Sequence, residues 1–418
     1  MIKNTINSTY DCIVVGGGPA GSTTAALVAD AGYSALLIER EKMPRMHVGE
    51  SLMPEIHWTI KRLGMLKKLR CSGFTKKVGV QFVNSNGRES QPFFFEEHDP
   101  RESSQTWHVE RPEFDKLFFD NAAEKGADCF DETRATAVDL SSNAPRVQIR
   151  SSRGTSHEVR CQVLVDATGQ QAFLANRLGV QAVNPDLHKA AIWGHFRGAK
   201  RNENGVAEVT TILHTANKRS WFWYIPLSGD KVSVGLVSDN DYLLKGRGSP
   251  DKAFNEEAIQ CPALCERLAD AEKINQLRVG KEFSYTSKQH AGDGWVLVGD
   301  AYGFIDPIYS TGVFLAMKSG ELAADSIIDG LRCGNLSAEK LGEWTGEFNR
   351  GVELFRKLVS AFYTPEFSFA DFIKKHPHYQ GNLTDLLIGR AFYNGAERIF
   401  ADLDPAVQAA QVLEKVRN

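Results

Sequence analysis

Three glycines near the start of the chain have the spacing of a turn that holds phosphate groups. Gly16, Gly18 and Gly21 follow an apolar run at 12–15 and open an alanine-rich stretch that includes Ala20. The first glycine permits a tight turn, the second lets backbone approach phosphate, and the third allows a helix to pack on a strand. The helix start adds N–H donors and a partial positive charge. This pattern predicts a dinucleotide pyrophosphate site rather than a glycine-rich turn without a ligand.

Acidic residues close two further predicted strands. The apolar run 35–38 ends at Glu39, whose carboxylate can accept hydrogen bonds from ribose hydroxyls. The run 295–299 ends at Asp300, which we expect beside the ribityl chain of FAD, although an ordinary helix N-cap is the alternative. Together with 166–169 (Asp-Ala-Thr-Gly), these motifs resemble the glutathione-reductase-type FAD fold of the single-component aromatic hydroxylases over roughly residues 10 to 330.

Two tryptophans form a second motif. The segment 221–226 reads Trp-Phe-Trp-Tyr-Ile-Pro and is similar to the W-x-W-x-I-P motif of flavin-dependent halogenases. On a strand, Trp221 and Trp223 project to the same face and make one apolar aromatic wall. The resemblance implies that this wall keeps the organic substrate away from the flavin, which suppresses hydroxylation. Packing in an aromatic-rich sheet is the alternative.

A pair of adjacent lysines adds to this resemblance. The halogenases carry a lysine two residues before a glycine, and Lys77 before Gly79 fits while Lys76 does not. The two side chains point to opposite faces of a strand, so one can be buried. A buried amine loses its proton readily and can act on hypohalous acid as nucleophile or hydrogen-bond donor. Two lysines on a solvated strand edge are the alternative.

A Ser-Thr-Gly turn at 310–312 opens another predicted helix. Its backbone N–H groups suit an anion, and the resemblance assigns Thr311 and Gly312 to the halide, with Gly312 and Val313 also against the cofactor. Simple contact with the isoalloxazine is the alternative. Tyr309 stands where tryptophan halogenases have a glutamate that acts on indole, so we do not expect free tryptophan as the substrate. The match is closer to the phenol and pyrrole halogenases, whose electron-rich substrates need less help from an enzyme base.

Further cofactor contacts follow from the family pattern. Gly49 lies in 48–54 (Val-Gly-Glu-Ser-Leu-Met-Pro), where residues 49–51 are expected near the flavin or along a tunnel. Arg45 and Arg111 are candidate FAD contacts. Each arginine could equally be a surface ion-pair partner.

These motifs must be positioned by an α/β fold with α+β character overall. The expected fold is a glutathione-reductase-type, Rossmann-like FAD-binding domain with an inserted antiparallel β-sheet substrate domain and a helical C-terminal segment. The FAD-binding domain is discontinuous and comprises residues 8–80, 105–175 and 275–335. The substrate domain comprises 81–104 and 176–274, and the helical C-terminal region comprises 336–418.

Individual elements are expected from periodicity and from the Gly and Pro positions. They are helices over 53–69, 111–125 and 312–330, strands over 76–82, around 147 and 163 and over 295–300, antiparallel strands over 190–237, and a loop or sheet edge over 91–101.

Composition limits the partners and the compartment. With 49 Lys plus Arg against 52 Asp plus Glu, the net charge of −3 gives no reason to expect nucleic-acid or anionic-membrane binding. The seven cysteines are scattered and lack a CxxC pair, which indicates reduced thiols in a cytoplasm and no metal site. The N-terminal stretch has neither a signal-peptide h-region nor a membrane span.

The leading hypothesis is therefore a two-component halogenase. It would take reduced FAD from a separate flavin reductase and use O2 with chloride or bromide to make hypohalous acid. Through Lys77, this acid would halogenate a phenol or pyrrole that is free or tethered to an acyl carrier protein. An FAD-dependent monooxygenase or oxidoreductase of the same superfamily is the runner-up, and a non-catalytic flavin-binding interaction protein is the third reading. Aromatic residues that could line a substrate pocket are Phe93 to Phe95, Phe355, Phe362, Tyr363, Phe367, Phe369 and Phe372.

Overall fold

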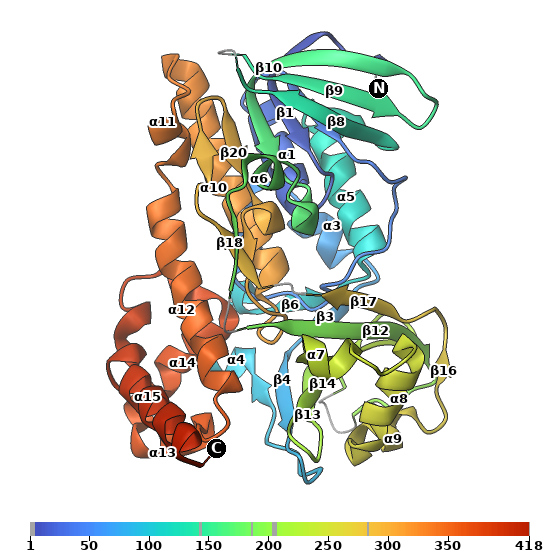
Figure 1. Cartoon of the computed structure of the whole chain (residues 1–418), viewed down its shortest axis with the longest axis vertical. Coiled ribbons are helices and arrows are strands. Elements are labelled where there is room, and N and C mark those ends of the chain that lie inside the picture. Colours follow the sequence, from blue (N-terminus) through green and yellow to red (C-terminus); the bar gives the residue numbers. More distant parts are fainter. Residues whose placement is uncertain (1–4, 142–143, 185–186, 203–206, 282–283, 418) are drawn as a thin grey trace.

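Two large sheets and a group of C-terminal helices make up the computed structural model, which describes residues 5–141, 144–184, 187–202, 207–281 and 284–417 (Figure 1). The first sheet lies in the upper half of the view, the second lies below it, and the C-terminal helices run along the left side. The mixed α/β class expected from the sequence is confirmed.

The first sheet is mainly parallel and has strand order β19-β20-β10-β1-β2-β7, with β8 and β9 extending an antiparallel flap from β10. Its central strands are buried apolar runs, as a sheet covered on both faces requires. The strands are β1 (Thr9–Val15), β2 (Ala35–Ile38), β7 (Asp128–Phe130), β8 (Thr133–Asp139), β9 (Arg146–Ser151), β10 (Ser156–Asp166), β19 (Ala291–Gly292) and β20 (Trp295–Leu297).

Three helices pack together on this sheet. Helix α1 (Pro19–Asp30) lies between α5 (Arg111–Glu124) and α10 (Thr311–Cys333). Proline stands at the start of α1, where its missing N–H costs no helical hydrogen bond. Helices α1 and α10 approach each other closely at Gly320. A Cβ at this position would lie only 2.6 Å from the Ala20 carbonyl oxygen, so the approach requires glycine. The N-termini of α1 and α10 both face the cavity described below.

The second sheet is mainly antiparallel and has strand order β16-β12-β15-β14-β13-β4-β5, with β17 also paired to β12. Alternate residues of β14 divide between two cores. Phe222 and Tyr224 pack toward α8 and α9, whereas Trp221 and Trp223 belong to the core that contains the first sheet. The elements are β4 (Gly79–Val83), β5 (Phe93–Phe94), β12 (Lys189–Arg197), β13 (Val209–His214), β14 (Ser220–Pro226), β15 (Lys231–Asp239), β16 (Glu272–Lys273), β17 (Arg278–Lys281), α7 (Asn240–Leu244), α8 (Pro250–Ile259) and α9 (Pro262–Leu268).

Helices dominate the C-terminal part, as expected. The longest is amphipathic, and its apolar face includes Phe348, Phe355 and Leu358. Within the described residues, no helix is both long and apolar enough to cross a membrane. The helices and 3-10 turns are α11 (Ala338–Gly342), α12 (Thr345–Tyr363), α13 (Phe369–Lys375), η4 (Pro377–Tyr379), α14 (Gln380–Ile388), η5 (Arg390–Phe392), η6 (Ala396–Ile399) and α15 (Phe400–Arg417).

Short elements connect these parts. A two-stranded pair, β3 with β6, lies between the two large sheets in the view, and a three-stranded sheet has the order β11-β18-β21. The remaining elements are α2 (Ile56–Arg62), α3 (Leu66–Arg70), β3 (Thr75–Lys77), α4 (Phe95–His98), η1 (Glu102–Ser104), β6 (Thr106–His108), η2 (Gly169–Gln171), α6 (Phe173–Leu178), β11 (Gln181–Val183), β18 (Tyr285–Ser287), η3 (Gly299–Ala301) and β21 (Gly303–Phe304).

Three expected elements differ from the structure. The helix over 53–69 is two helices, because Gly64 adopts a left-handed conformation between them. The strand over 76–82 is broken at Val78, since β3 pairs with β6 while β4 pairs with β13 and β5. The strand over 295–300 ends at Leu297, and Asp300 lies in the following 3-10 turn. The stretch 91–101 includes the sheet edge β5 and also forms the single turn α4.

Candidate functional site

A cavity of about 540 Å³ runs along the first sheet from the glycine turn to the start of α10. At one end, Gly16 adopts a φ of +112°, and a Cβ there would lie 2.2 Å from the Ala167 carbonyl oxygen. A Cβ on Gly21 would lie 1.9 Å from the Gly16 carbonyl oxygen. Both positions therefore require glycine, and the backbone N–H groups at the start of α1 face the cavity.

The carboxylate at the end of β2 is tied to this turn. Glu39 accepts hydrogen bonds from the Gly17 N–H at 3.0 Å and the Glu41 N–H at 3.0 Å. It also pairs with Arg45, whose Nε lies 3.3 Å from Glu39 Oε2. The predicted ribose acceptor is thus held rigidly in the cavity wall, where a further lone pair can face a hydroxyl.

The two arginines named as candidate contacts share one buried partner. Arg45 Nη1 lies 2.9 Å from Asp115 Oδ2, and Arg111 Nε lies 2.7 Å from Asp115 Oδ1. Arg111 also donates to the Val48 carbonyl oxygen. Both side chains are buried and line the cavity, so neither is a surface ion-pair partner. The shared carboxylate fixes both guanidinium groups.

Asp300 lines the far part of the cavity. Burial raises the pKa of its carboxyl to about 7, although Arg111 acts in the opposite direction. A carboxyl in such a position gains from hydroxyl donors, because these stabilise its charged form.

The tryptophan pair forms a wall, as the sequence predicts. The rings of Trp221 and Trp223 are 6.3 Å apart and tilted by 56°. Trp223 lines the cavity and donates to Ser233 Oγ at 3.1 Å. Gly235 stands opposite it in register, and a Cβ there would lie 2.0 Å from the indole. The indole therefore occupies space that only glycine leaves free.

The two lysines divide as expected: Lys77 is 3% exposed, whereas Lys76 is exposed to solvent. Lys77 Nζ donates to the Leu52 carbonyl oxygen at 2.9 Å and lies 5.6 Å from the centre of the Phe95 ring. Burial lowers the pKa of this ammonium to about 7. A substantial fraction of the amine is therefore neutral and nucleophilic near neutral pH.

A chain of hydroxyl groups connects the α10 turn to the surroundings of Lys77. Ser310 Oγ lies 3.1 Å from Ser51 Oγ, and Ser51 Oγ lies 2.9 Å from Thr210 Oγ1. Thr210 Oγ1 lies 2.8 Å from His108 Nε2. The pKa of this imidazole is well below its ordinary value, first because of burial and then because of the Lys77 charge. A continuous polar path therefore leads from the cavity into the protein.

The Ser-Thr-Gly turn stands at the N-terminus of α10. Ser310 holds a left-handed conformation with φ of +59°, and Thr311 is buried. A small cavity of about 20 Å³ adjoins the turn and is lined by Thr311, Gly312, Phe304 and Arg356, among others. This space suits a single small species such as a water or an anion.

A second polar network supports the tryptophan wall from behind. Trp221 Nε1 donates to Tyr363 Oη at 3.0 Å, and Tyr363 Oη donates to Asp306 Oδ2 at 3.1 Å. Burial raises the pKa of Asp306 to about 7. Helix α12, which ends at Tyr363, is thereby joined to the wall.

The aromatic residues proposed for a substrate pocket separate into groups. Phe362 contacts Trp221 and Tyr309, with ring centres 6.1 and 6.3 Å apart respectively. Phe95 faces Lys77, whereas Phe355 lies in the core. Phe367 packs on both Phe369 and Phe372.

Most of the predicted cofactor residues meet at one cavity. Those that line it are Gly16, Gly18, Ala20, Glu39, Arg45, Gly49, Arg111, Asp300, Gly312 and Val313, and the catalytic candidate Trp223 lines it too. Gly21 packs behind the turn, Trp221 lies behind Trp223, Thr311 lines the small cavity, and Lys77 lies behind the segment 50–52.

Residues that the sequence reasoning did not assign also contribute. His195 forms a hydrogen bond with Glu50, and Thr210 forms one with Ser51. Asn275 in turn bonds to His195, and His108 bonds to Thr210. Two of these residues could have been noticed in the sequence, because each is a polar residue within a largely apolar strand. They are His195 on β12 and Thr210 on β13.

The residues present fit FAD. The turn at Gly16 suits a pyrophosphate, Glu39 suits a ribose and Asp300 suits a ribityl chain. At the α10 end, Glu50 is 3% exposed and lines the cavity, and its Oε2 has no hydrogen-bond partner among the described residues. The turn itself keeps the open backbone that a pyrophosphate requires, because a Cβ on Gly16 would clash with the Ala167 carbonyl oxygen.

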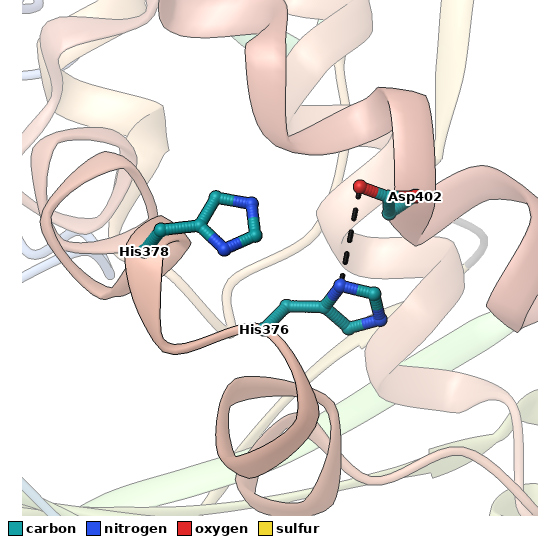
Figure 2. Close-up of side chains that lie close together, drawn as sticks. All are labelled: His376, His378 and Asp402. Carbon is teal, nitrogen blue, oxygen red and sulfur yellow. Dashed lines mark ion pairs between the residues drawn. The ribbon is translucent and has the colours of Figure 1, made fainter.

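Figure 2 shows a separate cluster in the C-terminal helices, formed by His376, His378 and Asp402. Their ligating atoms lie within 4.8 Å of one another, and His376 Nδ1 is 4.0 Å from Asp402 Oδ2. Asp402 Oδ2 already accepts from Tyr379 Oη at 2.8 Å. The 4.0 Å between His376 Nδ1 and Asp402 Oδ2 is wider than the roughly 3.3 Å expected between two ligands of a tetrahedral zinc ion. We assign no metal to this cluster.

Comparison with known proteins gives concordant results. The chain matches the tryptophan halogenase family over residues 11–105 and 96–368. It is 34% identical to the 1H-pyrrole-2-carbonyl-[peptidyl-carrier protein] brominase of Pseudoalteromonas luteoviolacea, over 77% of this chain and 78% of that protein. It is 27% identical to the corresponding chlorinase of Pseudomonas fluorescens, over 92% of this chain and 90% of that protein. The structure of the flavin-dependent brominase Bmp2 superimposes with a TM-score of 0.86 at 30% identity, covering 96% of this chain and 98% of that one.

Proposed function

Because the chain belongs to the tryptophan halogenase family and is an FAD-dependent halogenase that uses oxygen and a halide, we propose that it halogenates an electron-rich aromatic ring. The ring is a pyrrole or a phenol, and reduced FAD is supplied by a separate flavin reductase. A pyrrole-2-carbonyl group tethered to a carrier protein is the first substrate to test, since two relatives that match most of this chain act on it. Tyr309, in place of a glutamate, argues against free tryptophan.

Bound FAD in its reduced form supplies, with oxygen, the oxidising power that converts halide into hypohalous acid. The glycine turn, Glu39 and Asp300 would bind and orient this cofactor. Thr311 and Gly312 would hold the halide, and the cavity of about 20 Å³ beside them supports this role because it has the size of one small ion. Arg356, which lines the same cavity, brings a positive charge close to that site.

The observation that carries the proposal is the burial of Lys77 behind the cavity wall. Its amine donates to the carbonyl of Leu52, the residue next to Ser51, so the cavity and the amine lie on two sides of one extended segment. Trp223 stands at the cavity and Trp221 stands toward Tyr309 and Phe362. This order suits a wall that keeps the aromatic substrate beyond the flavin.

Lys77 would present hypohalous acid to the ring. A carbon–halogen bond forms at the ring, the oxygen–halogen bond breaks, and the oxygen leaves as water with the proton that the ring carbon releases. The neutral amine that burial favours can accept a hydrogen bond from the acid or take up the halogen. Pyrroles and phenols are electron-rich enough to react without a dedicated carboxylate base.

The test supplies the enzyme with FAD, an added flavin reductase, NADH, oxygen and either bromide or chloride. Carrier-tethered pyrrole-2-carboxylate and a free phenol are offered in parallel, and products are identified by mass spectrometry. Halogenated product in the native protein and none in Lys77→Ala, with FAD binding retained, is the expected result. Hydroxylated product without halogenated product would refute the proposal, as would unchanged halogenation by Lys77→Ala.

A further inference from the structure

Arg390, at the start of η5, joins three carboxylates from different parts of the chain. Its Nε lies 3.2 Å from Glu55 Oε1, its Nη1 lies 2.9 Å from Asp385 Oδ1, and its Nη2 pairs with Asp99 Oδ2. Glu55 and Asp99 are buried, and the arginine side chain is 14% exposed. Because a guanidinium presents its donors in a rigid fork, one side chain can hold several carboxylates at set positions.

Two of these carboxylates belong to the segments that cover Lys77. Glu55 stands three residues after Leu52, whose carbonyl oxygen accepts the hydrogen bond from Lys77 Nζ. Asp99 follows α4, and its N–H donates at 3.0 Å to the carbonyl oxygen of Phe95, whose ring lies against the same amine. The guanidinium therefore ties together the two segments between which the lysine is buried.

The backbone beside the arginine is fixed as well. Gly389 has a φ of +110°, and a Cβ there would lie 2.8 Å from Glu55 Cβ. The Glu55 N–H donates to the Ile388 carbonyl oxygen at 3.1 Å. Helix α4 contacts α14 beside it (Figure 1), where His98 Nε2 lies 3.0 Å from Asp385 Oδ1. The end of α14 is thus a firm base from which the guanidinium reaches both covering segments.

The state of Lys77 depends on these segments staying closed. The amine faces the Leu52 carbonyl on one side and the Phe95 ring of α4 on another, and the titratable group nearby on β6 is His108. Burial lowers the pKa of the ammonium. An ammonium that water reaches returns toward its ordinary pKa, because hydration stabilises the charged form.

We propose that Arg390 is a positioning residue for Lys77, which bridges Glu55 and Asp99 and thereby holds the two covering segments together and keeps water from the amine. A neutral, nucleophilic amine near neutral pH is the consequence. The value of this to the enzyme rests on the proposed function, in which Lys77 presents hypohalous acid to the ring. An ion-pair network that only stabilises the fold is the alternative that the test must separate.

Three variants distinguish the bridge from the charge that it carries. Arg390→Met keeps much of the length of the side chain and removes every donor. Arg390→Lys keeps the positive charge but replaces the rigid fork by a single ammonium. Arg101→Gln is the matched control, because the exposed Arg101 also pairs with Asp99, so the control removes the same charge beside Asp99 while the bridge stays in place.

Trace acetylation of the full chain with acetic anhydride, from about pH 5 to about pH 11, measures the amine directly, because only the neutral form reacts. Mass spectrometry of a peptide that contains both lysines reports Lys77, with the exposed Lys76 as the internal reference. In Arg390→Met, we expect the apparent pKa of Lys77 to rise by at least about one unit and its labelling at high pH to become at least about threefold faster. Arg390→Lys shifts both in the same direction by less, and Arg101→Gln leaves both close to the native values.

An unchanged Lys77 in both Arg390 variants would overturn the proposal, even if their urea unfolding shows lower stability, since the network would then be merely structural. A shift in Arg101→Gln as large as that in Arg390→Met would also overturn it, because charge and not the bridge would be the cause. If Arg390→Met does not fold, Arg390→Lys decides by the same measurement. Since no halogenation is measured, the outcome is separate from the fate of the proposed function.

Discussion

Replacing Lys77 by methionine should make the protein more stable while it abolishes halogenation. Lys77 is 3% exposed, and burial lowers its pKa from 10.5 to about 7. At about pH 7, the unfolded chain therefore binds nearly one proton at this amine and the native chain binds about half. The native state is penalised by roughly 4 kcal/mol at this pH, because each pKa unit corresponds to about 1.4 kcal/mol.

The pH dependence has a definite sign. Between the native pKa of about 7 and the unfolded value of 10.5, the unfolded state binds more protons, so the free energy of unfolding rises with pH through this group. At about pH 9 the penalty is reduced to roughly 2 kcal/mol. Methionine has a similar length and no charge, and it loses only the hydrogen bond to the Leu52 carbonyl, worth about 1 kcal/mol.

Urea unfolding of the FAD-free protein at about pH 7 and about pH 9 measures both effects. Lys77→Met should gain roughly 3 kcal/mol over the native protein at the lower pH and roughly 1 kcal/mol at the higher pH. Lys76→Met, on the exposed face of β3, should stay within about 0.5 kcal/mol of the native protein and keep its halogenation activity. Equal stability of Lys77→Met and the native protein, or a difference that does not change with pH, would refute the reasoning about the buried amine.

Three further predictions concern the cavity and the tryptophan wall. As the pH falls below about 7, Asp300 takes up a proton and accepts fewer hydrogen bonds, so the Kd for FAD should rise by up to about tenfold per pH unit. The Asp300→Asn variant should lack this pH dependence. A pH-independent Kd in the native protein would contradict the prediction. Gly235→Ala places a Cβ 2.0 Å from the Trp223 indole and should cost about 1–3 kcal/mol in urea unfolding, whereas Gly73→Ala, where a Cβ meets open space, should cost far less. Tyr363→Phe removes the acceptor of Trp221 Nε1 and the donor to Asp306, so a loss of about 1–3 kcal/mol is expected, and a loss below about 0.5 kcal/mol would show that this network does not hold the wall.

Much of the cofactor end was predictable because its signals are local. Gly16, Gly18 and Gly21 are close neighbours in the chain, and the strand before them and the helix after them follow from short-range periodicity. The division of Lys76 from Lys77 follows from the two-residue period of a strand. The same period places Trp221 and Trp223 on one face.

The interruption of the predicted strand 76–82 was not visible in the sequence. An apolar and polar alternation continues through Val78, but β3 and β4 pair with different partners, and pairing depends on which strands the fold brings alongside. For the same reason, the sequence predicted that one of the two lysines can be buried but did not predict which side chains would pack against it. Phe95, which lies over Lys77, belongs to a stretch that the sequence describes only as loop or sheet edge.

The sequence by itself therefore determined the nucleotide turn, the faces of the lysine and tryptophan pairs and, through their resemblance to known motifs, the chemistry to expect. Only the tertiary structure brought Glu50 together with His195 and Asn275, which lie 145 and 225 residues further along the chain. It also joined Ser310, Ser51, Thr210 and His108 into one path. No periodic pattern in the sequence predicts hydrogen bonds between such distant groups, because they form only where two sheets and the end of a helix meet at one cavity.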